Sequence, residues 1–188
     1  MKSWYILNMN SESFEHNILF PKIAYELKKM EAVDQEIRKR SPEEFDGIDH
    51  DKIHTERMKE IVAEIGWPTI SKVGVEGADY AWTLVQHIDR KVDLDFQVRC
   101  LQLMKEALSG EVDITNIAYL EDRVRVNQDR GQLYGTQFNR IDGKYIPKLI
   151  EDEANVDARR ALIGMGPLQE QIDMMYEAYG SDQDSKEL

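Results

Sequence analysis

The sequence predicts a mainly α-helical protein, a bundle of about six helices with one small β-hairpin. Apolar residues recur at helical spacing along most of the 188 residues. Glycine and proline interrupt these stretches, as at Gly66-Trp67-Pro68, where helices are expected to end. Only the region of residues 132–149 has a β signal. Length and composition fit a single domain, which we place at residues 1–180, followed by a polar tail at 181–188.

The first half of the chain contains three predicted helices. The first covers 21–40, because Pro21 suits a first turn and Ser41-Pro42 stops the helix. The second covers 51–65. The third covers 76–88, is apolar on nearly all sides and is therefore expected to be central.

The second half continues with helices over 94–109 and 115–128. Two strands, 132–138 and 144–149, are expected on either side of the turn dipeptide Asp142-Gly143. A shorter helical piece at 156–162 and an amphipathic helix at 167–179 complete the fold.

Composition limits the class of partner. The net charge of −12 disfavours nucleic acid and anionic membrane surfaces. The uninterrupted apolar runs are far shorter than the ~20 residues of a spanning helix. We identify no signal peptide and expect a cytoplasmic protein. The single cysteine, Cys100, excludes an internal disulfide and is expected to be a buried hydrophobic residue.

Polar side chains on core-facing stripes indicate a site, since each costs about 1–3 kcal/mol when unpaired. They lie on five predicted helices and are Asp34 with Arg38 one turn later, His54, His87, Gln97, and a group on one helix face comprising Tyr119, Asp122 and Arg123. Each has a structural alternative: a surface ion pair, a hydrogen-bonded core histidine, a glutamine bound to a loop carbonyl, or a clamp on the hairpin. Their occurrence together favours a shared pocket.

The partner of His87 is left open between Asp34 and Asp89. Asp89 is two residues from His87, roughly 200° around a helix, so it reaches the imidazole only if the helix ends near Ile88.

Common catalytic motifs are missing. The segment from His50 to His54 has the spacing of two metal ligands, but it spans a predicted helix start, so we expect no metal. We also expect no cofactor, since the sequence has no dinucleotide fingerprint, P-loop or nucleophile elbow.

Several ordered segments between residues 30 and 176 resemble the bacterial domain-of-unknown-function family 6624. They include Gly66-Trp67-Pro68, Gln86-His87-Ile88-Asp89, and Gln132-Leu133-Tyr134-Gly135-Thr136-Gln137-Phe138. The resemblance implies the same polar positions and adds Gln86, Asp89, Gln132, Tyr134 and Gln137. His54 departs from the family pattern, which more usually has asparagine there. The family has no established activity, so the resemblance names no substrate.

We therefore expect an enzyme that acts on a small polar molecule in a pocket centred on His87 and Arg123. The sequence favours an anionic substrate. His87 would be the general acid or base, oriented by Asp34 or Asp89. Substrate would be held by Arg123 and by Arg38, Tyr119, Asp122, Gln86, Gln97, Tyr134 and Gln137. The alternatives are a non-catalytic acidic interaction or immunity-like protein, and a small-ligand sensor without turnover.

Overall fold

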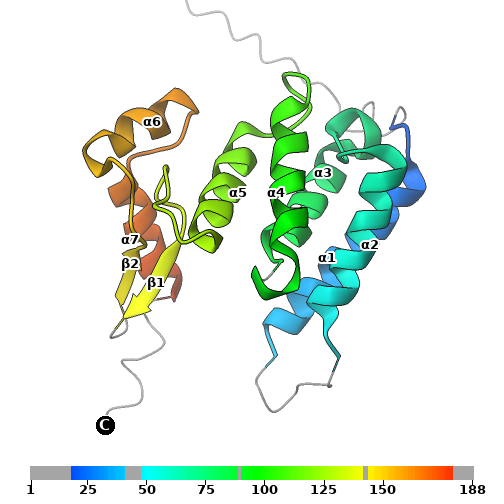
Figure 1. The fold of residues 1–188 in the computed structure, drawn as a ribbon, viewed down its shortest axis with the longest axis horizontal. Helices are drawn as coiled ribbons and strands as arrows, with labels where there is room; N and C mark the ends of the chain where they lie inside the picture. Colours follow the sequence, from blue (N-terminus) through cyan, green and yellow to red (C-terminus); the bar gives the residue numbers. More distant parts are fainter. Residues whose placement is uncertain (1–17, 41–47, 89, 142–143, 180–188) are drawn as a thin grey trace, which may run out of the picture.

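The fold described here is that of a computed structural model of the chain. It describes residues 18–40, 48–88, 90–141 and 144–179, with the backbone alone at 90–91 and 178–179. Seven α-helices and one antiparallel pair of strands are present in this part, which confirms the predicted mainly α-helical fold (Figure 1). The predicted tail at 181–188 and the turn dipeptide at 142–143 lie outside the described residues.

Helices α1 and α2 have the predicted positions. Helix α1 (Pro21–Arg38) begins with proline in its first turn, and α2 (His50–Ile65) begins after Asp49, whose carboxylate accepts a hydrogen bond from the Lys52 amide at 3.0 Å. Gly66, with φ +69°, ends α2 as the sequence predicts.

Helix α3 (Ile70–Gln86) begins earlier than predicted. Its first turn is separated from the rest by Gly74, whose φ of +79° and ψ of 169° interrupt the helix. Beyond this kink the helix follows the predicted range and ends at Gln86, with His87 as its C-cap. Helix α3 packs on α1 and contacts α2, α4 and α5, so the predicted central position of this helix is confirmed.

Helices α4 (Arg90–Glu106) and α5 (Ile114–Asn127) are both capped by aspartate. Asp93 is non-helical and accepts a hydrogen bond from the Phe96 amide at 2.8 Å, so the regular part of α4 begins at Leu94, as predicted. Asp113 likewise accepts a hydrogen bond from the Thr115 amide at 2.7 Å.

The hairpin is shorter than predicted. Strand β1 (Phe138–Ile141) pairs with β2 (Lys144–Pro147), with Phe138 opposite Pro147. The prediction that the first strand covers 132–138 was wrong. Residues 132–137 instead form a loop, whose backbone groups are hydrogen-bonded to buried side chains. A 3₁₀ turn, η4 (Glu153–Asn155), then leads into α6 (Val156–Leu162) and α7 (Leu168–Tyr179).

The main core lies among α1 to α5 and is built from side chains such as Leu27, Met58, Ile61, Val85 and Leu120. A smaller cluster of Ile150, Val156 and Leu168, with Ile172 against it, lies under α6 and α7. These two helices and the hairpin lie at the opposite end of the molecule from α1 and α2 (Figure 1). No helix in the described part of the chain is long and apolar enough to cross a lipid bilayer.

Candidate functional site

A cluster of charged side chains forms where the end of α1, the start of α2 and the end of α3 meet. Asp34 lies one turn before the end of α1 and is buried, with a relative exposure of 3%. Arg38 is the last residue of α1, Asp51 belongs to the first turn of α2, and His87 caps α3. Three helix ends therefore bring together residues that are up to 53 positions apart in the sequence.

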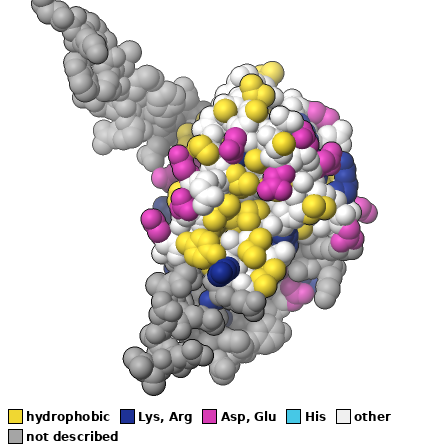
Figure 2. Space-filling view, turned by 90° about the vertical axis from the view of Figure 1, so that its left-hand side faces the viewer, with side chains coloured by type: hydrophobic (Ala, Val, Ile, Leu, Met, Phe, Trp, Pro, Cys, Tyr) yellow, Lys and Arg dark blue, Asp and Glu magenta, His cyan; other side chains and the backbone are white. Residues whose placement is uncertain are grey.

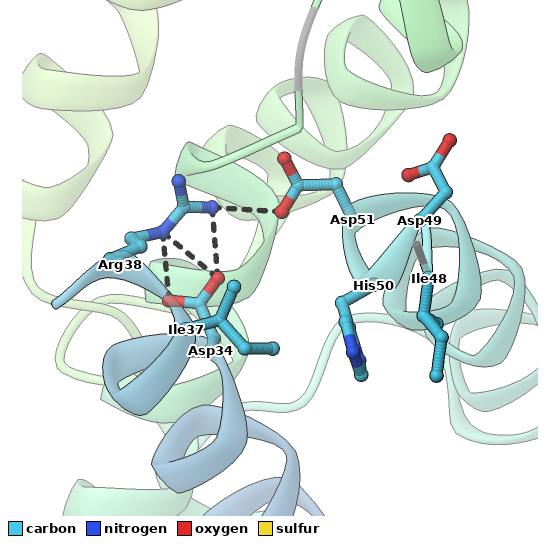
Figure 3. A pocket seen from close by; sticks show the side chains of 7 residues that line it. All are labelled: Asp34, Ile37, Arg38, Ile48, Asp49, His50 and Asp51. Carbon is cyan, nitrogen blue, oxygen red and sulfur yellow. Dashed lines mark hydrogen bonds and ion pairs between the residues drawn. The ribbon is translucent and has the colours of Figure 1, made fainter. Parts of the chain in front are cut away.

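Hydrogen bonds join these four side chains into one network. The Asp34 Oδ2 atom lies 2.7 Å from His87 Nδ1. Arg38 Nε donates to both carboxylate oxygens of Asp34, at 3.0 and 3.1 Å. Arg38 Nη2 lies 2.9 Å from Asp34 Oδ1 and 2.9 Å from Asp51 Oδ1 (Figure 3). Asp34 is thus the common partner of a guanidinium and an imidazole.

The buried carboxylate of Asp34 is held in its ionised form. Burial alone would raise its pKa, but the hydrogen bonds from His87 and Arg38 outweigh burial and lower the pKa to about 2. Ionised Asp34 can only accept hydrogen bonds.

This ionisation fixes the tautomer of His87. A ring nitrogen 2.7 Å from an oxygen that only accepts must be the donor, so Nδ1 carries the proton. The Arg38 Nε atom, 2.9 Å from the same nitrogen, then donates to Asp34 and not to the ring. In the neutral ring the lone pair consequently lies on Nε2, and the His87 side chain is 25% exposed. Such a nitrogen can take up a proton from a bound molecule.

A cavity of about 400 Å³ lies beside the network. Its described lining combines three carboxylates, one guanidinium, one imidazole and two apolar side chains: Asp34, Asp49, Asp51, Arg38, His50, Ile37 and Ile48. Figure 3 shows α1 contributing one wall and the start of α2 the other, with Arg38 and Asp51 joined across the gap. His87 does not line this cavity itself, but it is bonded to Asp34, which does.

Two further histidines belong to the neighbouring turns of α2. The prediction that a helix start separates His50 from His54 was wrong, because α2 begins at His50 and their ring centroids are 6.3 Å apart. Burial lowers the pKa of His54, whose Nδ1 has no hydrogen-bond partner in the described structure. Within the described residues, no group of three or more His, Cys, Asp or Glu side chains could hold a metal ion.

Asp122, a predicted substrate-binding residue, instead binds the backbone of the loop at 132–137. It is fully buried and accepts hydrogen bonds from the amides of Leu133, Tyr134 and Thr136 at 2.6 to 3.1 Å. The Thr136 hydroxyl adds a fourth, at 3.0 Å. These hydrogen bonds form in place of the strand pairing that the sequence predicts, and all of their donors belong to the protein's own loop.

The glutamines and Tyr134 also make internal contacts. Gln132, fully buried, donates to the carbonyls of Gln137 and Lys148 and accepts from the Gln137 amide. Gln137 donates to the Thr136 hydroxyl at 3.0 Å, and burial raises the pKa of Tyr134, which is half-buried in the same loop. These residues hold the loop and do not line the cavity at Asp34.

Gln97 and Gln86 lie near the end of α3. The Gln97 amide donates to the carbonyls of Val85 and Ile88, at 2.9 and 3.3 Å, and accepts from Asn127. The structural alternative, a glutamine bound to backbone carbonyls, therefore describes Gln97. Gln86 is buried next to His87 in the chain, and its Oε1 has no hydrogen-bond partner among the described residues.

The remaining predicted residues lie elsewhere. Tyr119 donates from its hydroxyl to Gln171 Oε1 at 3.1 Å and meets Trp82 edge-on. Arg123 is half-buried one turn later on α5 and does not line the cavity at Asp34. Asp89 lies outside the described residues, so the carboxylate seen to bind His87 is that of Asp34.

The sequence did not reveal the roles of two polar residues, Asp51 and Arg160. Asp51 completes the network at Arg38. The only sign of this role in the sequence was its position just after Asp49, the aspartate that caps α2. Arg160 is 2% exposed at the far end of the molecule. Helix α6 is so short that its sequence has no apolar stripe for a charged residue to interrupt, so burial of Arg160 could not be predicted.

Comparison with known proteins identifies the family. The sequence profile of a family of unknown function, DUF6624, matches residues 21–183. The chain therefore belongs to this family, as its polar segments suggested. No curated protein and no solved structure gives a significant match.

Proposed function

We propose that the protein is an enzyme that acts on a small polar molecule by proton transfer, with His87 as the general acid or base and Asp34 as its orienting partner. The observation that carries this proposal is the 2.7 Å hydrogen bond between partly exposed His87 and buried Asp34, which lines a cavity of about 400 Å³.

The chemistry follows from the assigned tautomer. His87 Nε2 takes a proton from the substrate or from a water molecule, and the resulting imidazolium is stabilised by ionised Asp34. The same proton then returns to the leaving group or to the rearranged product, so the enzyme is regenerated. Elimination, isomerisation and hydrolysis by an activated water all fit this cycle. Thiol chemistry does not fit, because Cys100 is fully buried and burial raises its pKa far above the usual range.

The charges of the cavity support a neutral or cationic substrate. Arg38 balances Asp34, and two further carboxylates, Asp49 and Asp51, remain on the described lining. An anionic substrate, which the sequence favoured through Arg123, would approach these carboxylates. Ile37 and Ile48 offer apolar walls to the carbon skeleton of the substrate.

Substrate profiling tests the proposal. The wild type and His87→Gln would each be incubated with panels of polyamines, amino acids, sugars and nucleosides, and consumption would be followed by mass spectrometry. We expect one class to be consumed by the wild type and not by His87→Gln. A matched variant, His50→Gln, removes a histidine that lines the cavity but is not bonded to Asp34. Turnover that survives His87→Gln and is lost in His50→Gln would contradict the role assigned to His87.

A non-catalytic interaction protein is the second candidate, and one surface feature favours it. On the side formed by α6, α7 and the hairpin, hydrophobic side chains gather with acidic ones around them (Figure 2). Leu149 and Leu162, in this part of the chain, are 77% and 85% exposed. An apolar surface with an acidic rim suits a basic partner protein. Cross-linking in cells would support this candidate if a basic protein is captured by the wild type and lost with Leu162→Asp.

The sensor alternative uses the same cavity without turnover. Saturable binding of a panel compound that is never converted would support it. That result would keep the site and overturn the catalytic role of His87.

A further inference from the structure

A second cavity lies far from the His87 network, between α5, α7 and the connection from α6 to α7. Its volume is about 250 Å³, below the ~300–1,000 Å³ typical of drug-sized and cofactor sites, so it suits a small metabolite. Its described lining joins polar side chains with two methionines and two glycines: Thr115, Tyr119, Arg160, Glu170, Gln171, Met165, Met174, Gly164 and Gly166.

Arg160 lines this cavity as a buried cation without a contacting anion. Its side chain is only 2% exposed, and it forms no ion pair with the described residues. The neighbouring carboxylates are engaged elsewhere, since Asp122 binds the loop amides and Asp157 accepts from the Leu168 amide at 2.7 Å. Asp122, Asp157 and Glu170 attract the guanidinium from a distance, but none of them contacts it, so the position of a contacting anion is open to a ligand.

The hydrogen bonds of Arg160 leave one nitrogen for a ligand. Nε donates to the Gly166 carbonyl and Nη1 to the Tyr134 carbonyl, each at 2.6 Å. Nη2 makes no hydrogen bond within the described structure. A carboxylate in the cavity would supply both the missing acceptor and the missing negative charge.

A carboxylate of the protein, that of Glu170, lies next to Gly166. The Glu170 side chain is so close that a Cβ atom at Gly166 would collide with its Oε2. Glu170 is exposed and forms no ion pair with Arg160. One cation and one anion thus face the same small space without contacting each other, and Met165 and Met174 supply the apolar surface beside them.

We propose that this cavity binds a free α-amino acid with an apolar side chain. Arg160 holds the carboxylate, Glu170 holds the ammonium group, and the methionines contact the side chain. A zwitterion completes both charges at once, whereas a simple anion would leave Glu170 facing it. This site is independent of the proposed function at His87.

Binding of L-leucine, L-methionine and L-phenylalanine tests the proposal. Each would be titrated into the ¹⁵N-labelled full chain while amide resonances are recorded. We expect saturable shifts at Gly164 and Gly166 with at least one of the three. Two analogues of leucine isolate the charges: 4-methylpentanoate lacks the ammonium group, and leucinamide lacks the carboxylate. Each should bind at least ~10-fold more weakly than L-leucine, because each loses one charged contact.

Variants separate the site from a general effect on folding. Arg160→Gln should abolish binding, but it also removes two contacts to backbone carbonyls and so affects the fold. Glu170→Gln changes an exposed residue and should weaken L-leucine at least ~10-fold without weakening 4-methylpentanoate. Glu177→Gln, exposed on the same helix and outside the cavity, should leave binding unchanged.

Three results would overturn the proposal: no binding of any of the three amino acids at millimolar concentration, wild-type affinity for L-leucine in Glu170→Gln, or shifts confined to another part of the chain. His87→Gln should bind L-leucine as the wild type does, so failure of this site and failure of the proposed function are distinguishable.

Discussion

Replacing Asp34 by asparagine should destabilise the fold by a calculable amount. The pKa of Asp34 is lowered from 3.8 to about 2, and one pKa unit corresponds to ~1.4 kcal/mol. The ionised carboxylate therefore contributes about 2 kcal/mol to the free energy of unfolding near neutral pH. An asparagine side chain would keep the shape of the carboxylate but not the charge that Arg38 and His87 bind.

The sign of the pH dependence follows from the direction of the pKa change. A carboxyl whose pKa is lowered by folding contributes its stability above its unfolded pKa, and this contribution is lost as the pH falls through the folded value. Above about pH 5 there should thus be a stability difference between the wild type and Asp34→Asn. It should shrink between about pH 4 and pH 2, the window given by the two pKa values.

Urea unfolding at several pH values measures this difference directly. Asp51→Asn is the matched control, because Asp51 also binds Arg38 but is 38% exposed. Its loss should cost less than about 1 kcal/mol. An Asp34→Asn protein as stable as the wild type at pH 7, or a difference that does not change down to pH 2, would refute the reasoning.

Three further substitutions test other parts of the account by urea or thermal unfolding. Asp122→Asn should cost about 3 kcal/mol or more, since an amide cannot accept all four hydrogen bonds of the buried carboxylate; a loss below about 1 kcal/mol would contradict the loop clamp. Burial lowers the pKa of His54, so wild-type stability should decline as the pH falls below 6.5, and His54→Asn should remove that part of the decline. An unchanged slope in the variant would assign the decline to other groups. Gly110→Ala should cost about 1 kcal/mol, because φ is +83° there but the space is open. Gly135→Ala should cost more, because φ is +73° and the added Cβ would lie only 2.5 Å from Leu168 Cδ1. Equal losses in the two variants would show that the Leu168 contact is relieved without cost.

The helices could be predicted because local chemistry determines them. Pro21 begins α1, Asp93 and Asp113 cap α4 and α5, and Gly66 ends α2. Each of these signals acts within a few residues, so it can be recognised in the sequence alone.

Contacts between distant residues account for what could not be predicted. The loop at 132–137 reads as a strand by its pattern, and it is the carboxylate of Asp122, 11 to 14 residues earlier, that binds its amides instead. The same limit left the partner of His87 open, because Asp34 lies 53 residues away on another helix. Burial of polar residues was foreseen, but burial alone did not separate Gln97, which binds backbone carbonyls, from Asp34, which lines a cavity.

The most direct test of the central claim is ¹⁵N NMR of the neutral His87 ring in the full chain, recorded at alkaline pH. We expect a protonated Nδ1 and an unprotonated Nε2 in the wild type, because ionised Asp34 accepts the Nδ1 proton. Asp34→Asn should lose this preference. A wild-type ring protonated on Nε2, with Nδ1 accepting from Arg38, would contradict the claim, because His87 would then have no free nitrogen to act as a base.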